Sequence, residues 1–260
     1  MGYRTQTHSA RKRGRAVNAV NGDLFGPPTP AGAATDGQRA VNAVNGDLFG
    51  RDGAREPWSE WLGSGTVLLH GFATTDAAAI LADLARIIET SPFRHMVIVD
   101  GRPMSVAMTN CGALGWLSDT AGYRYSPFDP QSSHRWPPMP DSFSNLARAA
   151  AIQAGFSSFT PDACLINRYA VGARMSLHQD KDERDFRAPI VSVSLGLPAV
   201  FLLGGAKRTE RAQRLALIHG DVLVWGGQDR LRYHGVQPLK AGCHPLLGDA
   251  RINLTFRQAG

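Results

Sequence analysis

Two side chains that bind metals stand two positions apart in the segment Ser176-Leu-His-Gln-Asp-Lys-Asp-Glu183. In an extended strand, this spacing places His178 and Asp180 on one face, and Asp182 follows on the same face. A neutral imidazole and a carboxylate are two ligands of a facial triad, which a second histidine completes and which is typical of non-haem Fe(II) oxygenases. A His-x-Asp pair alone is a weak signal, because a polar strand edge facing water has the same pattern. The pair therefore predicts a metal site only together with a third ligand and a co-substrate site.

The third ligand must come from one of three downstream histidines, namely His219, His234 and His244. His219 begins a second His-x-Asp pair, but Gly220 beside it lies between two apolar runs, where a Gly-Asp sequence is typical of a chain reversal. His234 lies 54 residues after Asp180 and 17 before Arg251, on a predicted penultimate strand. The predicted iron ligands are therefore His178, Asp180 and His234.

The last predicted strand carries two arginines six residues apart. In Arg251-Ile-Asn-Leu-Thr-Phe-Arg257 polar and apolar residues alternate, so both arginines point to one face. Inside a double sheet they are costly unless they meet anions, and a guanidinium grips a carboxylate with two hydrogen bonds. 2-Oxoglutarate has two carboxylates and a keto oxygen that can chelate iron, and further donors could come from Asn167, Tyr169 and Asn253. The alternative is a solvent-facing polar strand, which the His-x-Asp pair disfavours.

The elements that must position these residues are mostly short strands. From Pro161 to the C-terminus, apolar segments alternate with Gly and Pro turns, which indicates a sandwich or jelly roll. Upstream, the periodicity predicts a strand over 65–70, helices over 75–89 and 141–155, and short strands and loops over 91–140. We expect Asp141 to cap the second helix and Ile152 to face inward.

Aromatic residues in the loop-rich stretch 91–140 have two interpretations. They could stack on nucleic-acid bases, or they could fill a small core. We expect Phe128 and Trp136 in the core. For Trp116 and Tyr123, both near glycines, the two interpretations are equally good.

Composition describes an ordinary soluble globular protein. The chain has 260 residues, of which 43% are hydrophobic and 19% charged. Its three cysteines have no CxxC spacing, which fits a reducing compartment. We find no pattern of a secretory signal or a transmembrane segment. We therefore expect a cytoplasmic monomer without membrane contact, and the net charge of +6 permits a nucleic-acid partner without requiring one.

The chain divides into three predicted regions. Residues 1–57 are rich in Gly, Ala, Pro and Asn and are predicted to be a disordered tail. Within them the sequence RAVNAVNGDLFG stands at 15–26 and again, unchanged, at 39–50. It could be a short binding motif around Asp-Leu-Phe, but we favour a solvated tail. The other regions are an N-terminal extension at 58–140 and a catalytic core at 141–260.

Together, these motifs resemble the AlkB family of Fe(II)/2-oxoglutarate dioxygenases. The resemblance rests on the order His-x-Asp, His, Arg and Arg, and on longer stretches between Trp58 and Gly260, at 105–111, 125–131, 162–169, 176–183, 188–198, 219–227, 234–242 and 253–260. It implies an α+β, mainly β fold. The core would be a double-stranded β-helix (jelly roll), and the N-terminal helix and strand extension would form a nucleotide-recognition lid.

The resemblance also implies a reaction, which is the oxidative demethylation of 1-methyladenine and 3-methylcytosine in DNA. Fe(II) would be the cofactor, and 2-oxoglutarate and O₂ the co-substrates. Decarboxylation of 2-oxoglutarate would be coupled to hydroxylation of the methyl group, which leaves as formaldehyde. The substrate would be methylated single-stranded DNA, with duplex DNA and RNA as further candidates, and the damaged base would be flipped out of the stack.

Substrate contacts are implied by the same resemblance. Trp116 and His178 resemble the pair that stacks around the base, and Asp182 resembles the residue that faces the adenine edge. Tyr123 and Arg208 resemble residues that contact the strand, and Met108 resembles a lid residue. The alternative function is a 2-oxoglutarate-dependent hydroxylase of a protein or small molecule, which would need the triad and the arginines but not these contacts.

Overall fold

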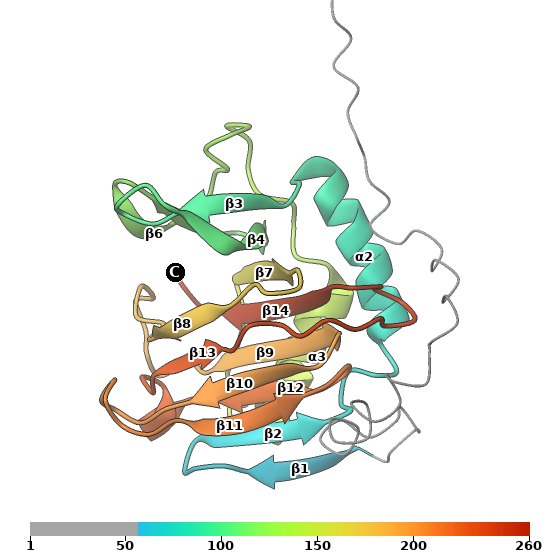
Figure 1. Cartoon of the computed structure of the whole chain (residues 1–260), viewed down its shortest axis with the longest axis vertical. Helices are drawn as coiled ribbons and strands as arrows, with labels where there is room; N and C mark the ends of the chain where they lie inside the picture. Colours follow the sequence, from blue (N-terminus) through green and yellow to red (C-terminus); the bar gives the residue numbers. More distant parts are fainter. Residues whose placement is uncertain (1–56) are drawn as a thin grey trace, which may run out of the picture.

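The structure is a computed structural model that describes residues 57–260, so most of the predicted tail, with both copies of the repeat, lies outside the described residues. The described chain is built around one large and one small β-sheet with two helices (Figure 1). The eight-stranded sheet has the order β1 (Trp58–Trp61), β2 (Thr66–His70), β12 (Val222–Trp225), β9 (Ile190–Gly196), β14 (Arg251–Arg257), β7 (Ala163–Tyr169), β4 (Pro103–Gly112) and β3 (Arg94–Val97). The four-stranded sheet has the order β11 (Gln213–Leu217), β10 (Ala199–Leu203), β13 (His234–Val236) and β8 (Met175–His178).

The two sheets pack face to face through one apolar cluster. Leu165 and Leu223 of the large sheet and Phe201 and Val236 of the small sheet belong to this cluster, and all four are buried. The catalytic residues predicted on β8, β13 and β14 thus come from the two facing sheets. This arrangement confirms the predicted mainly β, jelly-roll core.

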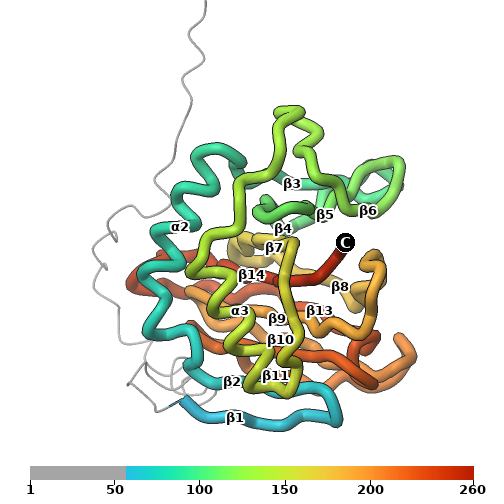
Figure 2. Tube along the Cα trace, turned by 180° about the vertical axis from the view of Figure 1, so that it is seen from behind, coloured from blue at the N-terminus to red at the C-terminus, as the bar shows by residue number. Residues whose placement is uncertain are grey.

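The opposite face of the large sheet is covered by α2 (Ala77–Thr90) and α3 (Asp141–Gln153), which lie in front of it in Figure 2. Ile252, Leu254 and Phe256 of β14 pack into this second core. Arg251 and Arg257, which alternate with them, therefore point to the small sheet, as the alternation in the sequence predicts. No helix within residues 57–260 is long and apolar enough to cross a membrane.

Two predictions for the second helix are wrong. The α3 helix begins at Asp141 itself, and Pro140 holds the N-cap position. Ile152 is 59% exposed, because the buried stripe of this helix lies elsewhere. That stripe consists of Phe143, Leu146, Ala147, Ala150 and Ala151, at the i, i+3, i+4 spacing of one helical face.

Strands from residues 58–140 extend both edges of the large sheet, with β1 and β2 at one edge and β3 and β4 at the other. The remaining two strands, β5 (Gly115–Asp119) and β6 (Gly122–Ser126), form a separate hairpin. Trp136 is buried, as expected. Phe128 is 46% exposed, contrary to expectation, and the Arg135 guanidinium lies 5.1 Å from its ring centre.

Candidate metal centre and co-substrate pocket

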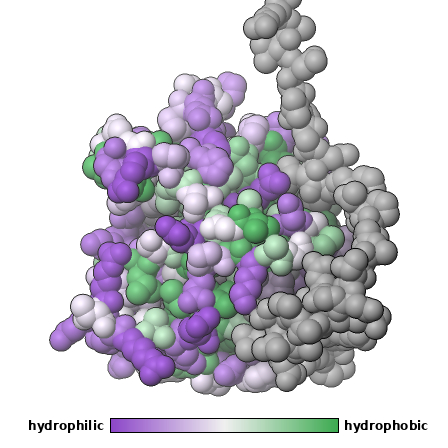
Figure 3. All heavy atoms as spheres, viewed as in Figure 1, coloured by the Kyte–Doolittle hydropathy of each residue, from purple (hydrophilic) through white to green (hydrophobic). Residues whose placement is uncertain are grey.

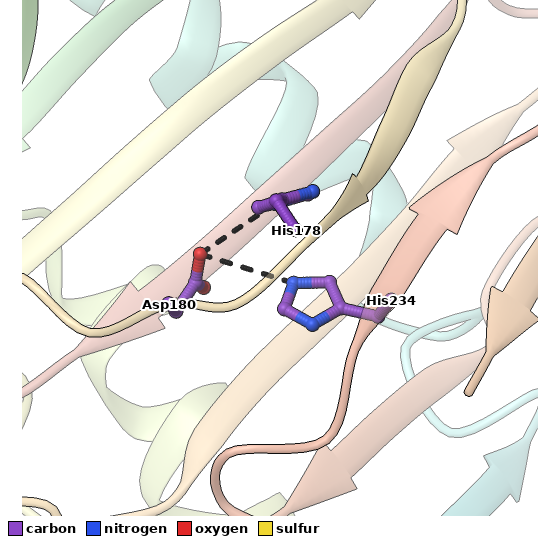
Figure 4. A group of neighbouring side chains, drawn as sticks. All are labelled: His178, Asp180 and His234. Carbon is purple, nitrogen blue, oxygen red and sulfur yellow. Dashed lines mark ion pairs between the residues drawn. The ribbon is translucent and has the colours of Figure 1, made fainter. Parts of the chain in front are cut away.

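The structure brings the three predicted iron ligands together between the sheets (Figure 4). His178 is the last residue of β8, and its register partner on the neighbouring strand is His234, the first residue of β13. The Nε2 atoms of His178 and His234 lie 3.6 Å and 3.8 Å from Oδ1 of Asp180. Among the described residues, this is the only group of three or more His, Cys, Asp or Glu side chains that could hold a metal.

Asp180 departs from the simple strand prediction, because β8 ends at His178 and Asp180 lies in the loop that follows. The loop is held in place by Arg230, whose Nη1 donates a hydrogen bond of 2.7 Å to the Asp180 backbone carbonyl. The carboxylate still meets the histidines. The ligand pair therefore depends on a tethered loop as well as on strand geometry.

Both histidines present the nitrogen that a metal needs. Nδ1 of His178 lies 2.8 Å from the Ser176 carbonyl, and Nδ1 of His234 lies 3.1 Å from the Arg232 carbonyl. A carbonyl only accepts hydrogen bonds, so each Nδ1 carries the proton and each Nε2 has a free lone pair. Burial lowers the pKa of His234 to about 4, which keeps its ring neutral at neutral pH. The site therefore suits a divalent metal.

The Asp180 carboxylate is prepared as an anionic ligand. Burial alone would raise its pKa, but the positive charge of Arg257 lowers the pKa well below the usual range. Arg257 donates two hydrogen bonds to Oδ2 of Asp180, of 2.6 Å and 3.0 Å. Because Arg257 uses Oδ2, the other oxygen, Oδ1, is the one that faces the histidines.

Register on the large sheet assembles the predicted co-substrate pocket. On β14, Arg251 pairs with Tyr169 of β7, and Asn253 pairs with Asn167. Arg251 is buried, and its guanidinium lies 5.0 Å from the centre of the Tyr169 ring. Its Nη2 donates to Oγ of Ser194, at 2.9 Å, and burial lowers its pKa.

Several buried donors here have no partner among the described residues. They are Nε and Nη1 of Arg251, Nη1 of Arg257 and Nε1 of Trp225. A buried guanidinium nitrogen without a hydrogen-bond partner is costly, and a carboxylate is the group that matches it. The donor set therefore fits a dicarboxylate such as 2-oxoglutarate beside a metal held by the triad.

Asn253 makes four hydrogen bonds within the described residues, and its predicted contact with the co-substrate stays a prediction. Its amide donates to Ser192 Oγ and to the Val193 carbonyl, at 2.8 Å and 3.0 Å, which uses both of its protons. Its oxygen accepts from Asn167, at 3.2 Å, and from Thr255, at 3.0 Å. Asn253 thus orders Asn167 and has no free donor of its own.

The predicted substrate residues are only partly brought together. Trp116 on β5 stacks on Tyr123 of β6, with ring centres 5.6 Å apart, and its Nε1 donates to Oδ2 of Asp182, at 2.9 Å. Arg208 lies in the exposed connection between β10 and β11. Met108 is fully buried on β4. It therefore does not reach the surface that carries Trp116, Tyr123, Asp182 and Arg208.

Sequence reasoning missed four side chains that shape the site. Ser192 and Ser194 could have been noticed, because they alternate with apolar residues on a buried strand. Glu183 and Arg230 form a buried ion pair at 2.9 Å, and no pattern in the sequence connects residues so far apart.

Comparison with known proteins agrees with this geometry. Residues 65–257 match the family model of the 2OG-Fe(II) oxygenase superfamily. The chain is 62% identical over 205 residues to the alpha-ketoglutarate-dependent dioxygenase AlkB of Escherichia coli, covering 79% of this chain and 95% of that protein. The chain belongs to the AlkB family.

More distant members of the AlkB family match as well. The nucleic acid dioxygenase ALKBH1 of Homo sapiens is 33% identical over 125 residues, which are 47% of this chain and 31% of that protein. The solved structure of OsALKBH1 superposes with a TM-score of 0.68 at 30% identity, covering 77% of this chain and all of that one. This AlkB-family chain is thus an Fe(II)- and 2-oxoglutarate-dependent dioxygenase, as the motifs predicted.

Proposed function

We propose that this dioxygenase is a DNA repair enzyme that removes the methyl groups of 1-methyladenine and 3-methylcytosine, with RNA as a further substrate. The observation that carries the proposal is the position of Trp116 and Asp182. Trp116 of β5 donates a hydrogen bond of 2.9 Å to Asp182, which lies in the loop after β8 that also carries Asp180. An aromatic ring beside a carboxylate can bind a flipped base. The aromatic ring stacks on the base, and the carboxylate accepts a hydrogen bond from its exocyclic amine.

His178 is well placed to touch such a base. Its side chain is 39% exposed, whereas those of Asp180 and His234 are 9% and 7% exposed. The metal centre is therefore open on the His178 side and closed on the others. A substrate that enters from this side would meet His178 and then Asp182, which follows in the loop after β8 and is bonded to Trp116.

A basic loop supports a nucleic-acid strand as the larger substrate. Lys207, Arg208 and Arg211 are exposed between β10 and β11, and Arg214 follows on β11. In Figures 1 and 2 this connection lies on the same side of the molecule as the β5–β6 hairpin, with the end of β8 between them. Hydrophilic residues gather over that side (Figure 3). The cationic side chains of this connection would contact backbone phosphates.

Three groups of residues would bind the metal, 2-oxoglutarate and the damaged base. His178, Asp180 and His234 would hold Fe(II), and Arg251 and Arg257, with Asn167 and Tyr169, would hold 2-oxoglutarate. When bound, the iron supplies the activation of O₂ that couples decarboxylation of 2-oxoglutarate to hydroxylation of the methyl group. The buried walls around Asp180 and His234 exclude water from the reacting atoms. Trp116, Asp182 and His178 would orient the base so that its methyl group faces the metal.

We also propose that the protein is cytoplasmic and acts as a monomer.

The relatives support a nucleic-acid substrate, because the human protein is named a nucleic acid dioxygenase. An Arabidopsis thaliana relative, 34% identical over 172 residues, is named a DNA N(6)-methyladenine demethylase.

The experiment that tests the function is mass spectrometry of oligonucleotides with one 3-methylcytosine or one 1-methyladenine. Single-stranded DNA, duplex DNA and single-stranded RNA are incubated with the protein, Fe(II), 2-oxoglutarate and O₂. Loss of the methyl mass only in the complete mixture is the expected result. Unchanged oligonucleotides, with succinate formed, would contradict the proposed substrate and favour a hydroxylase of a protein or small molecule.

A further inference from the structure

Two neighbouring residues connect the loop after β8 to the β5–β6 hairpin, in two different environments. Asp182 is exposed and accepts a hydrogen bond from Trp116. Glu183 is buried, with a side chain that is 2% exposed, and accepts a hydrogen bond of 2.6 Å from the Tyr125 hydroxyl on β6. Water competes for the first contact and not for the second, so the Tyr125–Glu183 bond is the stronger link between hairpin and core.

Glu183 is at the centre of a buried ionic network. Its Oε2 accepts from Arg230, at 2.9 Å, and its Oε1 lies 3.3 Å from Nε of Arg257. Arg257 in turn binds Asp180. The network contains two carboxylates and two guanidinium groups, so its charges balance only if each member keeps its partners.

Arg257 is the point at which this network meets the active site. Its Nε and Nη2 are used by Asp180, while its buried Nη1 lacks a partner within the described chain. A carboxylate bound at Nη1 and a metal bound at Oδ1 of Asp180 would both restrain this guanidinium. Glu183 would then be restrained through Arg257, and Tyr125 through Glu183.

We propose that Glu183 and Tyr125 are positioning residues that couple the β5–β6 hairpin to the co-substrate pocket. Binding of 2-oxoglutarate and metal holds the hairpin against the core, and a docked hairpin favours the arrangement of Arg257 that binds 2-oxoglutarate. Coupling between two sites is reciprocal, so each event strengthens the other by the same factor. The inference rests on the proposed placement of 2-oxoglutarate at Arg257.

The variant Tyr125→Phe isolates this link, because it removes the hydroxyl and keeps the ring. Its matched control is Asp119→Asn in the same hairpin. Asp119 holds Arg124 through an exposed pair of hydrogen bonds, of 2.9 Å and 2.6 Å, that does not reach the core. Both variants loosen the hairpin, and only Tyr125→Phe cuts its connection to Glu183.

The test is amide hydrogen exchange in residues 115–126, measured by mass spectrometry on the full chain loaded with Mn(II), with and without 2-oxoglutarate and without nucleic acid. We expect 2-oxoglutarate to slow exchange in the unmodified protein and in Asp119→Asn by about fivefold or more, and to leave it unchanged in Tyr125→Phe. Calorimetry should show 2-oxoglutarate binding to Tyr125→Phe weakened by up to the same factor.

The inference is overturned if Tyr125→Phe keeps the full response, or if the unmodified protein binds 2-oxoglutarate without any response of the hairpin. In both cases the proposed function stands. If calorimetry detects no 2-oxoglutarate binding to the unmodified protein, the proposed pocket fails and the inference fails with it.

Discussion

The co-substrate side and the substrate side of this active site are built in different ways. Arg251 and Arg257 lie on β14, inside the large sheet, and both are at most 5% exposed. Tyr123 and Arg208 lie in a hairpin and a loop, and Tyr123 is 49% exposed. The buried side is fixed by strand register and by ionic partners, whereas the exposed side depends on a few contacts such as that of Trp116 with Asp182. We therefore expect substitutions on the first side to stop the chemistry and those on the second to change substrate binding.

The largest effect is expected from Asp180→Ala. The variant loses a metal ligand and the partner of Arg257, so we expect succinate formation to fall by more than about 100-fold. The control is Asp185→Ala, whose carboxylate also pairs with an arginine but on the surface, where Arg187 is 92% exposed. Succinate is measured by mass spectrometry for both. Retained turnover in Asp180→Ala would exclude it as a ligand.

A smaller effect is expected from Arg257→Lys, which keeps the charge and loses the planar fork. The lysine cannot hold Asp180 and a carboxylate together, so the KM for 2-oxoglutarate should rise by at least about tenfold. Arg187→Lys makes the same change in the exposed pair with Asp185 and should leave this KM unchanged. An equal KM in the two variants would remove Arg257 from the co-substrate pocket.

The buried strands are also the part of the structure that could be predicted best from the sequence. On β14, polar and apolar residues alternate, and the side chains face two different cores, so Arg251 and Arg257 could be placed on one face. His234 could be chosen over His219 because Gly-Asp predicts a turn. In the structure His219 lies in this turn, and its Nδ1 accepts a hydrogen bond of 3.1 Å from the Gly196 amide.

Local patterns do not contain the long-range contacts. Glu183 and Arg230 are 47 residues apart and meet because the loop after β8 contacts the end of the 3-10 helix Gly227–Asp229. Whether the Asn253 side-chain amide has a free donor likewise depends on Asn167 and Ser192, which lie on the two neighbouring strands. Ile152 is apolar, which predicts an inward position. Its angular position on α3 nevertheless places it outside the buried stripe.

On the substrate side, Trp116→Ala should affect the nucleic acid and not the co-substrate. Loss of one base-stacking contact should raise the KM for a methylated oligonucleotide by about 5- to 150-fold, while the KM for 2-oxoglutarate stays the same. Trp58→Ala is the control, because Trp58 is 49% exposed on β1 and stacks on His70. A parallel rise in both KM values for Trp116→Ala would contradict the division between the two sides.

The smallest effect is expected from Arg208→Ala in the basic loop. If Arg208 contacts one phosphate, its removal should reduce the log–log salt slope of single-strand binding by about 0.7. Fluorescence anisotropy at several salt concentrations measures this slope. Arg86→Ala, on the outer face of α2 with a side chain that is 72% exposed, should keep the original slope. An unchanged slope in Arg208→Ala would remove the loop from the proposed interface.

The most direct test of the central claim is the product balance of one reaction. A single-stranded oligonucleotide with one 3-methylcytosine is incubated with the protein, Fe(II), 2-oxoglutarate and O₂, and succinate, formaldehyde and repaired cytosine are quantified together. The account predicts equal amounts of all three, and none of them in Asp180→Ala. Succinate without formaldehyde or repaired base would show that the metal centre works on a different substrate, and the absence of all three products from the unmodified protein would contradict the assignment of the triad.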